Sequence, residues 1–285
     1  MTSPIAFRAS ASSTTVLADL GPLQDLPGTW VGTGFNLISR PDKHDNQKFF
    51  LEINSTIETL EFAQIGAPIP NRGSAQDDIF FLGVRYLQQV SDAVTKGGLH
   101  VEPGLWLNLP ATTAPAAPAS IVRLATIPHG DALLAQGNAL EVAGGPQIQP
   151  ANSTPITHAT GMPVTDPDYL RPFTTTPLPP GIPAGAIANP NLVLTEAIQG
   201  QKITETVVLV ISTTNVIGGH TGGIQNIPFV VDNADAVSMS AIFWIEKVQD
   251  PEIGEFMQLQ YTQTILLNFL DIDWPHINVA TLVKQ

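Results

Sequence analysis

Apolar and polar residues alternate along most of the chain. The clearest case is the segment 255–270, in which nearly every second residue is large and apolar and most of the residues between are Gln, Thr or Asn. A period of two places successive side chains on opposite faces of a β-strand, one face buried and the other in water. No segment has the 3.6-residue apolar period of an amphipathic helix. The pattern therefore predicts an all-β protein.

The same reading gives strands over most of the chain outside one long interval. Turn signals rich in Gly, Pro, Asn and Asp separate them, as at Pro103-Gly104 and at 128–131. The expected strands are 26–35, 47–54, 57–65, 78–89, 99–102, 105–109, 120–127, 132–136, 203–212, 236–248, 255–270 and a last one beginning at His276. About ten long strands joined by short turns predict a closed antiparallel up-and-down β-barrel, which has no exposed edge strand.

The interval 138–200 departs from this pattern. It is poor in charge, and 16 of the 25 prolines of the chain lie between Pro103 and Pro190, which predicts little regular structure there. Its apolar content is too high for a free linker. We expect a flexible arm at 1–19 and a single barrel domain at 20–285, with 138–200 as a proline-rich insertion that packs as a flap or as a dimer arm.

Composition narrows the partners. The net charge is −13 with a pI of about 4.6, and only 13% of the 285 residues are charged. Such a field repels phosphate backbones and anionic membranes, so no nucleic acid or membrane partner is expected. The chain has no cysteine, and neither a signal peptide nor an 18-residue apolar run is evident. These features favour a cytoplasmic protein that takes a small-molecule ligand, and a homodimer is compatible with them.

Two short stretches carry candidate chemistry. Near the C-terminus, Pro275 fixes its own φ and biases Trp274 towards an extended conformation, so His276 enters its strand from a stiff direction suited to a metal ligand. A lone histidine at a strand start is more often a surface or structural residue. Near the N-terminus, Gly32 and Gly34 share a strand face with Trp30, and this bare face lets a flat molecule or another backbone come close.

Four blocks in one order resemble the nitrobindins, which are haem-binding ten-stranded β-barrels. The resemblance covers roughly 20–137 and 203–285. The blocks are Leu26-Pro-Gly-Thr-Trp-Val-Gly-Thr-Gly34, Gly98-Leu-His-Val-Glu-Pro-Gly-Leu-Trp106, Ile121-Val-Arg-Leu-Ala-Thr-Ile-Pro-His-Gly130 and Trp274-Pro-His-Ile-Asn-Val279. Two departures stand out: Phe35-Asn36-Leu37 replaces the glycine and Tyr-Pro that usually continue the first block, and the arginine expected in the second is Leu107 or Asn108.

The resemblance implies a cofactor, haem b, with His276 as the proximal ligand of its iron. It implies a cofactor-binding set of His276, Trp30, Gly32, Gly34, His100 and His129. From the residues alone, Trp30 is more readily a core residue, His100 pairs with Glu102 on one strand face, and His129 lies in a turn. A five-coordinate haem also needs a group that orients the second ring nitrogen of its histidine, and the sequence does not identify one.

Two functions follow from this reading. The first is a protein that holds ferric haem and binds a diatomic or peroxidic ligand, for scavenging or sensing nitric oxide or peroxynitrite, or for a peroxynitrite-isomerase or peroxidase-like reaction. The second is a lipocalin-like carrier of an apolar small molecule without haem. No nucleophile elbow, HExxH motif or spaced carboxylate pair suggests another chemistry.

Overall fold

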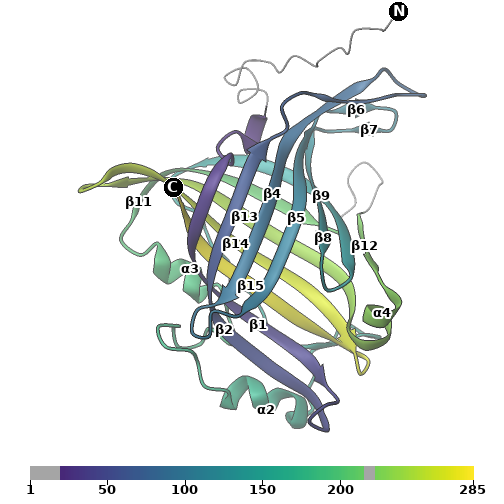
Figure 1. Ribbon diagram of the computed structural model, residues 1–285, viewed down its shortest axis with the longest axis vertical. Helices are drawn as coiled ribbons and strands as arrows, with labels where there is room; N and C mark the ends of the chain where they lie inside the picture. Colours follow the sequence, from purple (N-terminus) through teal and green to yellow (C-terminus); the bar gives the residue numbers. More distant parts are fainter. Residues whose placement is uncertain (1–19, 215–221) are drawn as a thin grey trace, which may run out of the picture.

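The computed structural model describes residues 20–214 and 222–285, so the arm expected at 1–19 lies outside the described residues. Ten long strands form the barrel, as Figure 1 shows. They are β1 (Gly28–Asp42), β2 (Gln47–Gln64), β4 (Ile79–Asp92), β5 (Gly98–Leu109), β8 (Ser120–Ile127), β9 (Asp131–Ala143), β11 (Lys202–Ser212), β13 (Asp235–Asp250), β14 (Gly254–Phe269) and β15 (Ile272–Lys284).

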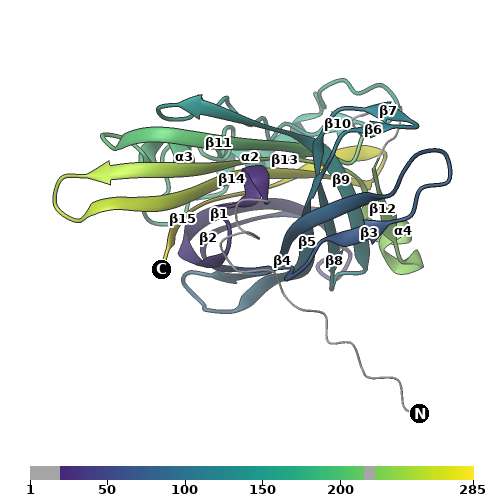
Figure 2. The same ribbon diagram turned by 90° about the horizontal axis from the view of Figure 1, so that it is seen from above.

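Every neighbouring pair in the ring is antiparallel, and β15 pairs with β1 to close it. The prediction of a closed antiparallel ten-stranded barrel is confirmed. Seen from above, the barrel is flattened, with β11, β13 and β14 across from β4 and β5 (Figure 2). Shorter pieces lie outside the ring, namely β3 (Ile69–Asn71), β6 (Thr112–Thr113), β7 (Ala116–Ala117), β10 (Ile156–Thr157) and β12 (Gly223–Asn226).

Several strands are longer than the sequence pattern predicted. The segments 99–102 and 105–109 form the single strand β5, so the turn expected at Pro103-Gly104 was wrong. Strand β8 pairs with β5 only from Gly104 onward, so Pro103 lies where β5 has a partner on one side alone. Proline is tolerated in a strand at such a position because its missing N–H is not needed by a second ladder.

The seam between β1 and β15 explains the glycines of the first block. Gly32 lies opposite Leu282 and Gly34 opposite Ala280. A Cβ atom on Gly32 would lie 2.0 Å from the carbonyl oxygen of Thr281, and one on Gly34 would lie 2.2 Å from that of Val279. The bare strand face was expected to lie against a flat molecule or against another backbone. The structure shows that it lies against the backbone of β15.

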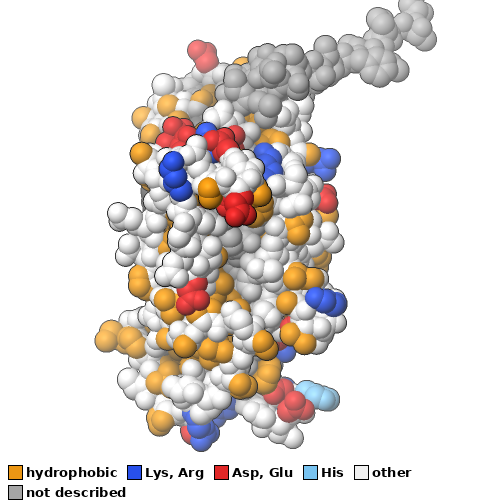
Figure 3. All heavy atoms as spheres, turned by 90° about the vertical axis from the view of Figure 1, so that its left-hand side faces the viewer, with side chains coloured by type: hydrophobic (Ala, Val, Ile, Leu, Met, Phe, Trp, Pro, Cys, Tyr) orange, Lys and Arg blue, Asp and Glu red, His pale blue; other side chains and the backbone are white. Residues whose placement is uncertain are grey.

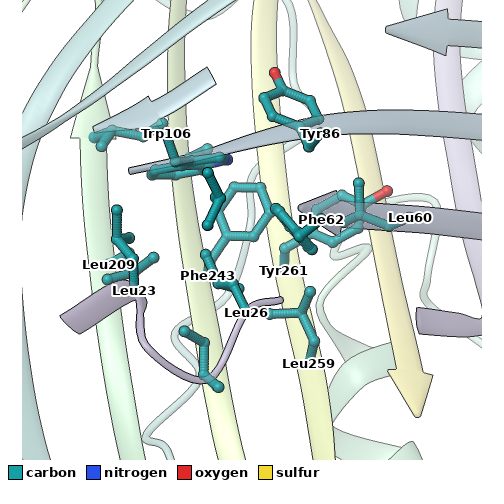
Figure 4. Close-up of a cluster of buried hydrophobic side chains, with 14 of the residues drawn as sticks. Leu23, Leu26, Leu60, Phe62, Tyr86, Trp106, Leu209, Phe243, Leu259 and Tyr261 are labelled. Atoms are coloured by element: carbon teal, nitrogen blue, oxygen red, sulfur yellow. The ribbon is translucent and has the colours of Figure 1, made fainter. Parts of the chain in front are cut away.

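Side chains of all ten strands fill the interior of the barrel. One end is closed by Leu20, Leu23 and Leu26, which lie in and around the short 3-10 helix η1 (Gly21–Leu23) and are fully buried with Trp30. Towards the middle, Trp106 and Tyr261 pack against Phe243 at ring-centroid distances of 5.1 and 5.0 Å (Figure 4). This apolar half is a packed core in which large side chains already fill the space.

A second hydrophobic cluster lies on the outside of the barrel, under the segment that joins β9 to β11. Strand β9 continues through 138 to Ala143, so this segment is 144–201. It carries β10, which pairs with β15, and the helices α2 (Pro167–Thr175) and α3 (Leu192–Ala197). Its buried residues Val164, Ile187 and Leu194 pack with outward-facing strand residues such as Phe35, Leu37, Trp244, Ile277 and Val279.

The helices form where the sequence predicted none. Helices α2 and α4 (Pro228–Ala234) each begin with a proline in their first turn, where the missing N–H has no intrahelical partner to lose. In α2, Asp166 adds an N-cap, its side chain accepting a hydrogen bond from the amide of Asp168 at 2.9 Å. Pro167, one of the prolines that were expected to exclude regular structure, therefore starts a helix instead.

The surface carries few charges, in keeping with the composition. On the side that holds α3, Figure 3 shows mostly backbone and uncharged polar side chains, both drawn in white, with hydrophobic groups between them and small separate groups of charge. No helix among the described residues is long and apolar enough to cross a membrane.

Candidate functional site at one end of the barrel

His276 lies near the start of β15, at the end of the barrel opposite η1. Its Nε2 atom is 2.8 Å from the Oδ1 atom of Asn36 on β1, across the seam. The next residues on its strand face, Asn278, Ala280 and Leu282, are buried inside the barrel. The strand face of β15 that carries His276 is therefore the inner face of the barrel.

Asn36 is the group that orients the imidazole of His276, and the sequence did not reveal it. An amide oxygen only accepts hydrogen bonds, so the contact places the ring hydrogen on Nε2 and leaves the lone pair on Nδ1. Burial, with the nearby His100 and His129, lowers the pKa of His276 to about 3. The side chain is thus a neutral, oriented imidazole at pH 7, which is the form that ligates metals.

His100 and His129 lie on the wall that faces His276. His100 is on β5 and His129 follows β8, and these strands are half-way round the ring from β15. Their ring centroids are 5.8 Å apart. Burial and the proximity of His100 lower the pKa of His129. The three histidines singled out from the sequence therefore meet at one end of the barrel, which we call the histidine mouth.

A buried ion pair lies directly inside the histidine mouth. His100 contacts Glu102 at 3.2 Å, and Glu102 contacts the Nη2 atom of Arg123 at 2.5 Å. Arg123 also donates to the hydroxyl of Tyr86 at 2.8 Å and to Gln263 at 2.5 Å. Burial alone raises the pKa of Glu102, but the Arg123 guanidinium beside it holds that pKa at about 2. Arg123 is itself fully buried, with 1% of its surface exposed.

A second buried network surrounds Glu58. The Tyr261 hydroxyl donates to Glu58 at 2.5 Å and receives hydrogen bonds from Asn278 at 2.6 Å and Gln88 at 2.8 Å. Burial raises the pKa of Glu58, although the hydrogen bonds it accepts act in the opposite direction. Together the two networks form a polar layer between the histidine mouth and the apolar half of the barrel.

The remaining residues expected at a cofactor lie elsewhere. Trp30 belongs to the closed apolar end, where its indole N–H donates to the carbonyl of Leu26 at 2.8 Å. Gly32 and Gly34 lie against the backbone of β15. Among residues 20–214 and 222–285, no group of three or more His, Asp or Glu side chains is arranged to hold a metal ion. A metal centre at the histidine mouth would depend on a cofactor that needs one protein ligand.

Sequence reasoning could have found Asn36 and the polar layer in part. Asn36 and Asn54 are strand positions occupied by a residue that strands disfavour, and Glu58 and Gln88 interrupt apolar faces. Which of these side chains share the barrel interior depends on a register between distant strands, such as Asn36 opposite Asn54 and Asn278.

Comparisons with known proteins give no sequence match and a structural match at low identity. No protein-family model matches the chain, and no curated protein sequence does. Among solved structures, the crystal structure of Rv2717c from M. tuberculosis aligns with 97% of this chain and 99% of its own, with 15% sequence identity and a TM-score of 0.46. The fold and the site define this chain as a closed ten-stranded antiparallel β-barrel with a polar mouth.

Proposed function

We propose that the histidine mouth binds ferric haem, with His276 as the protein ligand of the iron and a diatomic or peroxidic molecule as the second ligand. The observation that carries the proposal is the state of His276: a neutral imidazole whose orientation is set by Asn36 and which lies near His100 and His129. A haem iron needs one such imidazole.

The side chains at the mouth fit this group in two respects. The donor set offers a single neutral nitrogen with its partner nitrogen already hydrogen-bonded, the arrangement that histidine ligands of metals usually have. The polar layer of Arg123, Glu102, Glu58 and Tyr261 fills the barrel below His276. A bound macrocycle would therefore lie at the mouth itself, outside this layer.

The opposite wall supplies the second side of the proposed pocket. His129, whose pKa is lowered, is a neutral hydrogen-bonding group at pH 7. His100 is tied to Glu102 and through it to Arg123, which holds its ring in place. Bound haem supplies an iron centre that takes up a small ligand. The chain's own part is to hold the imidazole, to offer polar side chains across from it and to keep the interior below closed.

The test is haem binding by variants of single histidines. His276→Ala should abolish stoichiometric haem retention, seen as loss of the Soret band on titration with haemin, and should keep the β signature in far-UV circular dichroism. His44→Ala is the matched control, because the His44 side chain is 97% exposed in the turn between β1 and β2. His100→Ala and His129→Ala should retain haem.

Two results would overturn the assignment. An unchanged Soret band in His276→Ala would remove its role as ligand, and loss of haem from His100→Ala or His129→Ala alone would move that role to the opposite wall. If the wild-type protein binds no haem but takes up an apolar fluorescent probe in the barrel, the carrier function replaces this proposal.

A further inference from the structure

A chain of side-chain hydrogen bonds leads away from His276 to a carboxylate. From the Nε2 atom of His276 it passes to Asn36 at 2.8 Å, from Asn36 to Asn54 at 3.3 Å and from Asn54 to Asp92 at 2.9 Å. These four residues come from β15, β1, β2 and the end of β4, which are neighbours in the barrel. We call this chain the Asp92 relay.

We propose that the Asp92 relay fixes the tautomer and the ring orientation of His276, with Asp92, Asn54 and Asn36 as positioning residues. The inference deepens the proposed function, because it concerns the residue assigned there as the haem ligand. It adds a set of residues that reaches three hydrogen bonds away from the mouth.

The direction of the chain is set at its carboxylate end. Asp92 accepts the backbone N–H groups of Val94 and Thr95 at 2.8 and 2.6 Å with one oxygen, and the side-chain amide of Asn54 with the other. An ionised carboxylate only accepts, so Asn54 must turn its NH₂ group towards Asp92 and its oxygen towards Asn36. The same logic turns the oxygen of Asn36 towards His276.

The ring of His276 must therefore donate from Nε2. A neutral imidazole has one N–H, so the lone pair is confined to Nδ1. Without the relay the two tautomers are close in energy and the ring can turn, whereas the relay holds one nitrogen in a single role. Because the chain ends on a negative charge, it also favours the partial positive charge that an imidazole acquires when its lone pair is donated.

A purely structural role for these residues explains less. Asp92 needs only one oxygen to cap the β4–β5 turn, and its second oxygen is directed to Asn54. Asn36 and Asn54 face each other within two long strands, where Asn is disfavoured. Asp250 caps the β13–β14 turn in the same way, accepting the amides of Glu252 and Ile253 at 2.8 and 3.0 Å with one oxygen. A cap of this kind therefore does not require the second oxygen that Asp92 directs to Asn54.

The test reads the tautomer directly in the protein without haem. In the wild type labelled with ¹⁵N-histidine, long-range ¹H–¹⁵N correlation spectra should show His276 protonated at Nε2 and unprotonated at Nδ1. Asn54→Leu interrupts the relay and leaves the turn intact, while Asp92→Asn removes the carboxylate. Both variants should give averaged ¹⁵N shifts from mixed tautomers. Asp250→Asn disturbs an equivalent turn and should leave the His276 signals as in the wild type.

The proposal is overturned if wild-type His276 is protonated at Nδ1, or if Asn54→Leu leaves its Nε2–H form fully populated. A change in Asp92→Asn without one in Asn54→Leu would also overturn it, because the effect would then come from the turn. With haem bound, Asn54→Leu should lose haem to apomyoglobin about tenfold faster than wild type, the loss expected when a ligand-orienting partner is removed. A wild type with the expected tautomer and no haem binding would refute the proposed function and leave the relay standing.

Discussion

The inner and outer faces of β13, β14 and β15 are both buried, but by different means. Inside, Phe243 and Tyr261 are covered because the sheet closes on itself. Outside, Trp244 and Ile277 are covered by the segment 144–201, which is not part of the ring. The inner face depends on every strand of the barrel, whereas the outer face depends on one connection. We therefore expect the two faces to contribute separately to stability.

The buried polar groups of the two faces also differ, in how completely they are hydrogen-bonded. Inside, Arg123, Glu102 and Tyr86 bond to one another in a connected network. Outside, Gln260 donates to the carbonyl of Leu194, yet its own oxygen has no hydrogen-bond partner among the described residues, nor has one oxygen of Glu246. Unpartnered buried oxygens raise the free energy of the folded state. The outer cover is thus the less completely satisfied of the two.

The largest effect should come from removing the cover. Deleting 146–203 leaves Gly144, Gly145 and Thr204 as a hairpin loop, because Ala143 already lies opposite Glu205. The variant loses the packing of residues such as Ile187 and Leu194, so the free energy of unfolding should fall by roughly 5 kcal/mol in urea titrations. Light scattering should show self-association through the bared outer wall. A monodisperse variant of unchanged stability would contradict the separation of the two faces.

A change inside should be nearly as costly. Glu102→Gln leaves the charge of Arg123 buried without its counter-charge, and breaking a buried pair from one side costs about 4 kcal/mol. The control is Glu205→Gln, which breaks a pair with Lys247 whose side chains are 49% and 36% exposed. Exposed pairs contribute less than about 1 kcal/mol, so urea midpoints of the two variants should differ clearly.

The outer face should also respond to pH. Burial raises the pKa of Glu246 from 4.5 to about 7, so the folded protein holds a proton that the unfolded chain releases between these values. The contribution of Glu246 to the free energy of unfolding is fully present below pH 4.5 and is lost as the pH rises through 7. The loss is at most about 3 kcal/mol. Glu246→Gln should remove that loss, so the stability of the variant relative to the wild type should be greater at pH 8 than at pH 5. The exposed Glu255→Gln variant should follow the wild type.

The smallest expected effect is a difference between two leucines. Leu209 faces the interior and Leu194 lies on α3 in the cover, and both are 0% exposed. Leu→Ala costs 2 to 5 kcal/mol, less where the surroundings can move to fill the space. A short helix on a loop can shift more than a barrel strand, so Leu209→Ala should be about 1 to 2 kcal/mol more costly. Equal losses in calorimetry would argue that the cover is as rigid as the barrel.

This comparison also separates what the sequence could and could not predict. Strands such as β14 were predictable because large apolar residues of the inner face alternate with Gln, Thr and Asn on the other face. The insertion was expected to pack as a flap or as a dimer arm. The wall that it covers was not predictable, because Trp244 next to Phe243 reads as a continuous apolar run with no indication of what lies on each side. Leu267 and Phe269 share the parity of Tyr261, yet they pack in the outer cluster, beyond the end of the closed barrel.

At the candidate site, the sequence singled out the three histidines and did not reveal Asn36 as the partner of His276. His276 follows a proline, and His100 and His129 lie at turn-bounded strand ends, which are local features. That these three face one another follows from the order of strands around the ring, and the contact with Asn36 joins residues 240 positions apart. No local pattern encodes a pairing of that range.

The seam between the first and last strands also sets the order in which the protein can be made. Until β15 has been synthesised, β1 has an unpaired edge that can join another chain, and long-range pairing of this kind is slow. The amide of Gln285 donates to the carbonyl of Thr29 at 2.9 Å, so the seam continues beyond β15 to Gln285. The Asn36–His276 contact spans this seam. It therefore forms only after β15 has been synthesised.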